Sequence, residues 1–190
     1  LSLSMKVLNE NWWNIYDVST TKLISAWYYM AKSTALDYIN GNELKTETSY
    51  FYDNPHSAQL SRTITKYPDE SQIETTYSYA HEKGNTFLTG KNMVGIPLET
   101  EVKKNGVVIS KSEAKYPVSQ DDADLKTSGL ALPYEVNSFN LQSTQMDRQV
   151  SYDKYDAKGN LLQYTTKTGV PTTIIWDYSN TQPIAKIEGA

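Results

Sequence analysis

The sequence has 190 residues, a formal net charge of -4 from 18 Lys and Arg against 22 Asp and Glu, and no cysteine. This balance argues against a nucleic-acid-binding protein, which would carry a surplus of Lys and Arg on one face, and the lack of cysteine excludes disulfide scaffolds, zinc knuckles and thiol nucleophiles. No stretch approaches the roughly 20 apolar residues that a membrane-spanning helix requires.

Two aromatic clusters come first along the chain, at residues 12–16 and 27–30. We expect both to be strands that pack on the same sheet as the segments that follow, because aromatic residues favour strands.

Side chains then alternate in character at every second position over residues 44–52 and 72–79. In the second of these segments Ile73, Tyr77 and Tyr79 fall on one side, and polar residues fall on the other. A period of two places alternate side chains on opposite faces of a strand. No window shows an apolar stripe at helical spacing, so we expect few helices.

Turn sequences separate the strands and predict about five hairpins. The Asn-Gly pairs at 40–41 and 105–106 are the strongest of these signals, because both residue types accept the positive φ of a type I′ turn. Pro-Asp-Glu-Ser at 68–71 and Lys-Thr-Gly at 167–169 are also typical of turns, and residues 140–143 form a less regular connection. The predicted strands span residues 36–38, 44–52, 60–67, 72–79, 98–103, 107–116, 132–139, 145–155, 160–166 and 171–178.

Two stretches interrupt the pattern of hairpins. Residues 81–95 are rich in Gly, Asn and Lys, which predicts a connecting loop. Residues 118–129 place Ser119 and several aspartates ahead of Leu125, which predicts one short helical turn with a capping residue.

The clearest internal repeat runs from Tyr155 to Tyr178. Its Tyr-Asp pair closes one strand, Gly159 permits a tight turn that a Cβ atom would hinder, and Gly169 turns the next hairpin. Tyrosine, with 15 copies against 3 Phe and 4 Trp, joins strand propensity to an apolar ring with a polar tip. With only 38% hydrophobic residues, the composition favours extended β surface over a thick dry core.

This unit resembles the tyrosine-aspartate (YD) repeat family of bacterial rearrangement-hotspot (RHS) proteins, insecticidal toxin complexes and animal teneurins. The chain is also similar to long repeat proteins of Bacteroidetes-type bacteria. The resemblance implies an all-β fold of consecutive antiparallel β-hairpins of YD-repeat type that form a curved or spiralling sheet strip. On this interpretation residues 1–190 are a single such region, a fragment of a longer chain. The matching positions are Tyr155, Asp156, Gly159, Leu161, Gly169 and Tyr178.

The resemblance also implies a function. In toxin-associated members of the family the strip forms a hollow shell that encloses a toxin, and the shell ends in a self-cleavage element with an Asp-Pro pair. The chain has no Asp-Pro pair. The expected role is therefore that of a non-catalytic wall segment that encloses or displays a toxin or other cargo, in a secreted or cell-surface protein. Its expected partners are the rest of its own chain and the cargo.

No motif in the sequence predicts a catalytic, cofactor or metal site. His56 and His81 stand alone on separate loops, unlike metal ligands. The aspartates of residues 121–124 lack the central Gly and final Glu of an EF-hand loop. Asp153 and Asp156 could bind calcium beside a glycine turn, but hydrogen bonding of Asp156 to the turn backbone is favoured.

Aromatic residues near the start of the chain supply the alternative function. Trp12, Trp13, Trp27 and Tyr28 could stack on sugar rings, as in a cell-surface carbohydrate-binding or adhesin module. The favoured interpretation is that they pad the sheet where hydrophobic residues are scarce. Burial between strands would support padding, and an open groove would support glycan binding. A hydrolase is the least favoured reading, because the acidic residues alternate with lysines on exposed faces.

Overall fold

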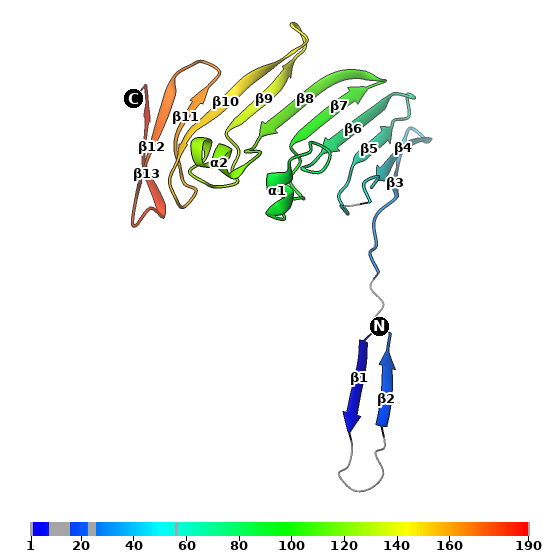
Figure 1. Ribbon diagram of the computed structural model, residues 1–190. Coiled ribbons are helices and arrows are strands. Elements are labelled where there is room, and N and C mark those ends of the chain that lie inside the picture. Colours follow the sequence, from blue (N-terminus) through cyan, green and yellow to red (C-terminus); the bar gives the residue numbers. More distant parts are fainter. Residues whose placement is uncertain (1, 8–15, 23–25, 56, 190) are drawn as a thin grey trace. The chain divides into compact units, whose positions relative to one another are not determined.

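In the computed structural model the chain forms two compact units, Leu1–Met30 and Ala31–Ala190, which are described separately (Figure 1). No helix in the described part of the chain is long and apolar enough to cross a membrane. The structure describes residues 2–7, 16–22, 26–55 and 57–189.

The first unit contains one antiparallel pair, β1 (Ser2–Val7) and β2 (Tyr16–Thr21). Of the two aromatic clusters, residues 12–15 lie outside the described residues. The expected strand at residues 27–30 was wrong, because this segment has no strand assignment. Strand propensity alone does not make a strand unless a neighbouring segment pairs with it in register.

The second unit is a single sheet of 11 strands whose spatial order is the chain order (Figure 1). Every neighbouring pair is antiparallel, and the sheet is an open, curved strip with β3 and β13 at its two edges. The prediction of an all-β fold built from consecutive hairpins is therefore confirmed. Its strands are β3 (Lys32–Ile39), β4 (Asn42–Phe51), β5 (Arg62–Lys66), β6 (Gln72–Ser78), β7 (Glu99–Lys104), β8 (Val107–Lys115), β9 (Glu135–Asn140), β10 (Gln145–Tyr155), β11 (Leu161–Thr166), β12 (Pro171–Asp177) and β13 (Gln182–Glu188).

Local turn chemistry sets the register of the hairpins. Asn40 and Gly41 join β3 to β4 with φ values of 52° and 78°, and Asn105 and Gly106 join β7 to β8 with 49° and 82°. These positive φ values are those of a type I′ turn, whose twist matches the flanking strands. The Asn-Gly signals therefore predicted both turns correctly.

The strand β13 was not predicted. Its second residue is Pro183, and proline within a run of residues argues against a central strand. The objection does not apply here, because β13 lies at the edge of the sheet and pairs only with β12.

The longer connections contain the only helices of the described residues. The expected loop at 81–95 was partly wrong, because it contains α1 (Thr86–Gly90), a helix too short to show an apolar stripe. The expected helical turn is α2 (Gln120–Lys126), and Ser119 caps it by accepting a hydrogen bond from Asp122 N at 3.1 Å.

The small hydrophobic core lies among these connections, at one end of the central strands. Ala80, Leu88 and Leu98 are buried there together. Most strand residues are instead half-buried, in keeping with the low hydrophobic content. The residues packed against this core are Phe87, Met93, Ile96, Tyr116 and Ala131.

The tight turn between β10 and β11 gives a first prediction. Gly159 has a φ of +89°, and an added Cβ atom would lie 3.4 Å from Leu132 Cδ1 and 3.5 Å from Leu130 Cδ1. We expect Gly159→Val to lower the free energy of unfolding by about 1 kcal/mol or more, because a side chain at this positive φ strains the backbone. Urea denaturation measures the change. Gly90→Val is the control, since Gly90 lies in open space without a positive φ. Equal losses in both variants would contradict the turn argument.

Candidate functional site

The sheet has two chemically different faces over its central strands. Residues that oppose one another across β6 to β9 share a face, so the registers assign each side chain. One face, here called the charged face, carries lysine and glutamate in alternation. The other face carries hydroxyl-bearing and apolar residues, with Lys104 at the end of β7 as its charged member. The charged face contains Glu74, Thr76, Ser78, Glu99, Glu101, Lys103, Lys111, Glu113, Lys115, Glu135 and Asn137; the other face contains Ile73, Thr75, Tyr77, Thr100, Val102, Lys104, Ser110, Ser112, Ala114, Val136 and Ser138.

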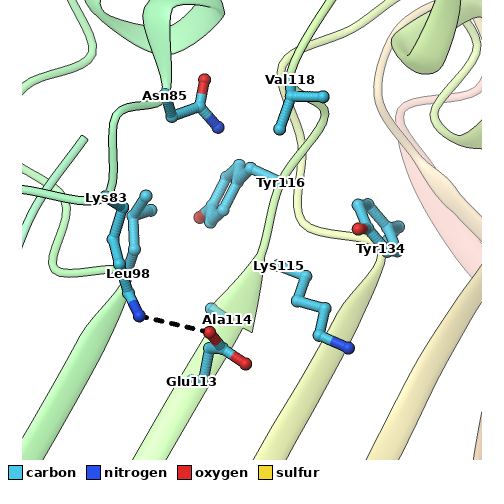
Figure 2. A pocket seen from close by; sticks show the side chains of 9 residues that line it. All are labelled: Lys83, Asn85, Leu98, Glu113, Ala114, Lys115, Tyr116, Val118 and Tyr134. Atoms are coloured by element: carbon cyan, nitrogen blue, oxygen red, sulfur yellow. Dashed lines mark hydrogen bonds and ion pairs between the residues drawn. The ribbon is translucent and has the colours of Figure 1, made fainter. Parts of the chain in front are cut away.

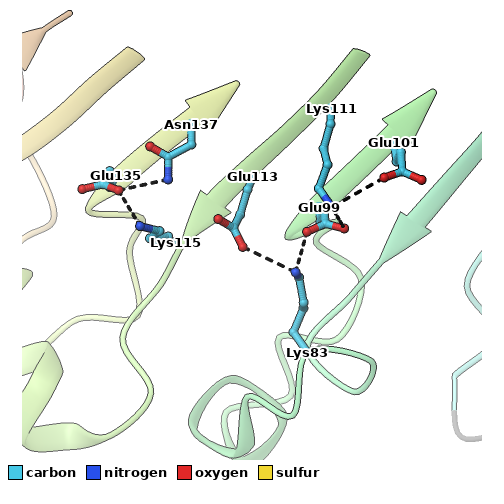
Figure 3. A network of polar contacts seen from close by, with 8 residues as sticks. All are labelled: Lys83, Glu99, Glu101, Lys111, Glu113, Lys115, Glu135 and Asn137. Atoms are coloured by element: carbon cyan, nitrogen blue, oxygen red, sulfur yellow. Dashed lines mark hydrogen bonds and ion pairs between the residues drawn. The ribbon is translucent and has the colours of Figure 1, made fainter. Parts of the chain in front are cut away.

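Ion pairs cross from strand to strand on the charged face (Figure 3). Lys111 on β8 reaches two carboxylates of β7, with Nζ 2.9 Å from Glu99 and 3.5 Å from Glu101. Lys83, from the connection after β6, bridges Glu99 at 2.6 Å and Glu113 at 3.4 Å. Neighbouring strands, and the connection between β6 and β7, are therefore tied together by shared carboxylates.

The same pattern continues onto β9. Lys115 Nζ lies 2.7 Å from Glu135, and the amide of Asn137 donates a hydrogen bond to the same carboxylate oxygen at 3.0 Å (Figure 3). The pair therefore links β8 to β9 and orders both side chains. Each exposed pair contributes little by itself, and a network with shared partners contributes more.

The pairing changes the acidity of the carboxylates. Burial raises the pKa of Glu99, but the hydrogen bonds from Lys83 and Lys111 outweigh it and hold the pKa below its usual range. The hydrogen bond from Lys103 lowers the pKa of Glu101. These are carboxylates held ionised, which suits ion pairing and not proton donation at neutral pH.

Acid is expected to weaken the fold through this network. Because Glu99, Glu101 and Glu135 have folded pKa values below the ordinary 4.5, their contribution is complete above about pH 5 and is lost as the pH falls through the lowered values. Urea unfolding at a series of pH values should show a flat free energy near neutrality and a decline below about pH 5. In Lys111→Met the decline should be shallower. Parallel curves for the two proteins would contradict the prediction.

An open pocket lies at the ends of the central strands, between the two helix-containing connections (Figure 2). Its volume is about 330 Å³, and the rings of Tyr116 and Tyr134 form part of its wall. Burial raises the pKa of Tyr116, so the phenol is protonated at neutral pH. The lining residues are Lys83, Asn85, Leu98, Glu113, Ala114, Lys115, Tyr116, Val118 and Tyr134.

The charged and amide side chains that line this pocket are engaged in contacts within the protein. Lys83 and Lys115 are engaged by glutamates, and the Asn85 amide donates to the Pro117 carbonyl oxygen at 3.0 Å. Two rings and several polar groups could contact a sugar, but the charged groups that line the pocket already form ion pairs within the protein. In the part of the chain that the structure describes, no cluster of His, Asp and Glu is suited to a metal ion.

Aromatic side chains close the open ends of three hairpins, and we call these contacts the aromatic latches. Tyr79, just after β6, donates its hydroxyl to the Leu60 carbonyl oxygen before β5 at 2.8 Å. Tyr155, the last residue of β10, donates in the same way to Pro133 before β9 at 2.7 Å. Each latch satisfies a backbone acceptor where the hairpin begins, so the hairpin ends do not fray.

The third latch lies between β11 and β12, where Trp176 replaces tyrosine. Its Nε1 donates to the Leu161 carbonyl oxygen at 2.9 Å. Sequence reasoning missed the roles of Tyr79 and Trp176, although an aromatic residue at the end of every second strand was available as the signal. It singled out Tyr178, which is exposed in the turn after β12 with a φ of 52°.

The structure brings Tyr155, Asp156, Gly159 and Leu161 together at the β10–β11 turn. Asp156 Oδ1 accepts hydrogen bonds from the backbone N–H groups of Lys158 and Asn160, both at 2.8 Å. The carboxylate therefore holds the turn around Gly159. Asp153 instead accepts hydrogen bonds from Ser151 and Thr165. Leu161 begins β11, and Gly169, with a φ of +81°, lies in the turn before β12.

Among the proposed sugar-stacking residues, Trp12 and Trp13 lie outside the described residues. Trp27 and Tyr28 are 53% and 90% exposed. The Trp27 ring lies 4.9 Å from that of Tyr29, measured between centroids. Of the two histidines, His81 lies in the connection before α1, and His56 lies outside the described residues.

In comparisons with known proteins, no family model matches the chain and no curated protein shows significant similarity to it.

Proposed function

We propose that the chain is a non-catalytic structural segment of a YD-repeat (RHS-type) shell that encloses or displays a toxin or other cargo, in a secreted or cell-surface protein. The observation that carries the proposal is the unbroken meander of β3 to β13, in which each hairpin pairs only with its neighbours in the chain. Such a sheet is built by repetition, and it lengthens without needing a central core.

The aromatic latches support this proposal because they recur with the hairpins. Burial raises the pKa of Tyr155 and of Tyr79, so both phenols remain donors under ordinary conditions. A hairpin with an aromatic latch at one end and a tight turn at the other makes most of its stabilising contacts within itself. Copies of it can therefore be added in series, which is what the wall of a large shell requires.

The charged face supports the same role. Lys111 and Lys83 join adjacent strands through shared carboxylates, so the sheet is held together at its surface and not only by its backbone. This compensates for the small number of fully buried side chains. A strip stabilised in this way can have solvent on both of its faces, as the wall of a hollow particle does.

Electron microscopy of the complete natural protein tests the proposal. A hollow particle of coiled β-strip with density inside would support a wall that encloses cargo. A solid rod or a surface filament would overturn it and direct attention to adhesion.

A second candidate, binding of surface carbohydrate, rests on the exposure of Trp27 and Tyr28. Adjacent exposed rings are suited to stacking on the apolar face of a sugar. A glycan array probed with the chain and with Trp27→Ala tests this function. Glycan signals that disappear in the variant would favour it, and an array without signals would exclude it for the glycans displayed.

A further inference from the structure

The two edges of the sheet differ in how well they are protected from further pairing. At one edge, β13 contains Pro183 and Lys186, and its register with β12 shifts between Ile175 and Trp176. Proline, lysine and such bulges are the devices that blunt an edge strand. The edge formed by β13 is therefore a poor template for another strand.

The strand β3 at the other edge lacks two of these devices, and its one lysine, Lys32, lies at its first position. It has 8 residues, no proline and a register with β4 that runs without a shift from Lys32 to Ile39. Three of its large apolar side chains are exposed: Leu36 at 46%, Tyr38 at 70% and Ile39 at 56%. A long, regular and partly apolar edge is a template for pairing with another strand.

The hydrogen bonding to β4 shows which groups of β3 are available. Tyr50 N donates to the Ala31 carbonyl oxygen at 2.9 Å, and these two residues stand one position before the opposed residues Lys32 and Ser49. Ala31 and Tyr50 are therefore a hydrogen-bonded pair of the ladder. Hydrogen-bonded and non-hydrogen-bonded pairs alternate along an antiparallel ladder. The backbone N–H and C=O groups of the odd-numbered residues of β3 therefore point toward β4. The backbone groups of the even-numbered residues point away from the sheet. These residues are Lys32, Thr34, Leu36 and Tyr38.

We propose that β3 pairs antiparallel with β3 of a second copy of this chain across a two-fold axis at Ala35. In this register each outward-pointing residue meets an outward-pointing residue of the second copy, Lys32 opposite Tyr38 and Thr34 opposite Leu36. Shifting the strands by two residues leaves some of these groups unpaired. The register is therefore the one that satisfies the most backbone donors and acceptors.

The side chains fit the same register. The ammonium of Lys32 is held by Glu47 at 2.7 Å, which leaves the methylene stem to lie along the Tyr38 ring of the second copy. The two Ala35 residues face each other on the axis as a non-hydrogen-bonded pair, where Cα atoms approach to about 4.5 Å and small side chains fit best. The pairing would join two 11-stranded sheets into one. It does not depend on what the strip encloses.

Substitutions of Ala35, the residue on the proposed two-fold axis, test the proposal with the full chain. Ala35 is exposed, so Ala35→Lys and Ala35→Glu should each fold but place like charges directly opposite one another in the dimer. In sedimentation velocity, the unmodified chain should shift toward twice the chain mass as its concentration rises, and each variant should remain at the chain mass. An equimolar mixture of the two variants should regain the dimer, because Lys then faces Glu.

Ile184→Lys is the matched control, since it adds a charge to the exposed surface of β13 and should leave the dimer intact. Hydrogen exchange of the unmodified chain adds a readout that needs no variant: the amides of Thr34, Leu36 and Tyr38 should become protected as concentration rises. A chain that stays monomeric at every concentration would overturn the proposal, as would dimers that survive in Ala35→Lys. Protection of these amides in a monomer would overturn it too, and would mean that another segment of the chain covers β3.

Discussion

Replacing Leu88 by alanine is expected to lower the free energy of unfolding by about 2–5 kcal/mol, which is the range for truncating a buried leucine and leaving a cavity in its place. Leu88 is completely buried and forms a cluster with Ala80 and Leu98. Because this core is small, few neighbours can move in to fill the space. A loss of this size would be a large part of the stability of a single domain.

Urea denaturation followed by circular dichroism measures the Leu88→Ala effect. Leu125→Ala provides a matched control, because Leu125 also lies in a short helix but is exposed. We expect the control to change the unfolding free energy by less than about 0.5 kcal/mol. A loss below about 1 kcal/mol for Leu88→Ala would show that the core contributes little and that the sheet is held by its surface network alone.

The repeating part of the fold was predictable because local chemistry determines it. Asn-Gly pairs specify type I′ turns whatever surrounds them, and the alternation over residues 72–79 specifies a strand with two unlike faces. The strand β10 was predicted with both of its ends, residues 145 and 155. In a meander the next strand is also the spatial neighbour, so predicting the hairpins was enough to predict the sheet order.

The parts that sequence reasoning missed depend on long-range contacts. The helix α1 has only 5 residues, so its periodicity is too short to be recognised, and it is held by Asn85 and by the core. The charged face was expected only as a solvated surface, since the registers that place Lys111 between Glu99 and Glu101 cannot be known from one strand. The latch of Trp176 was missed because the repeat was assigned through Tyr178.

The strongest polar contribution to the fold is expected from Asn85, which is buried and acts in two directions. Its Oδ1 accepts from Leu88 N at 3.0 Å and caps α1, and its Nδ2 donates to the Pro117 carbonyl oxygen at 3.0 Å. Asn85→Ala removes the cap and leaves a buried carbonyl oxygen unpaired. We expect the free energy of unfolding to fall by about 2–4 kcal/mol.

Asn85→Asp separates the two contributions of this residue, because a carboxylate still caps α1 but cannot donate to Pro117. In urea denaturation at neutral pH, the free energy of unfolding of the aspartate variant should therefore lie between those of the natural protein and Asn85→Ala, because the cap is kept and the hydrogen bond to Pro117 is lost. An aspartate variant as stable as the natural protein would mean that the bridge to Pro117 contributes nothing. The intermediate result would show that this amide joins the connection before β7 to the connection after β8. One side chain would then join the connections on either side of the β7–β8 hairpin, and contacts of this kind between neighbouring repeats let a strip with so small a core unfold as a unit.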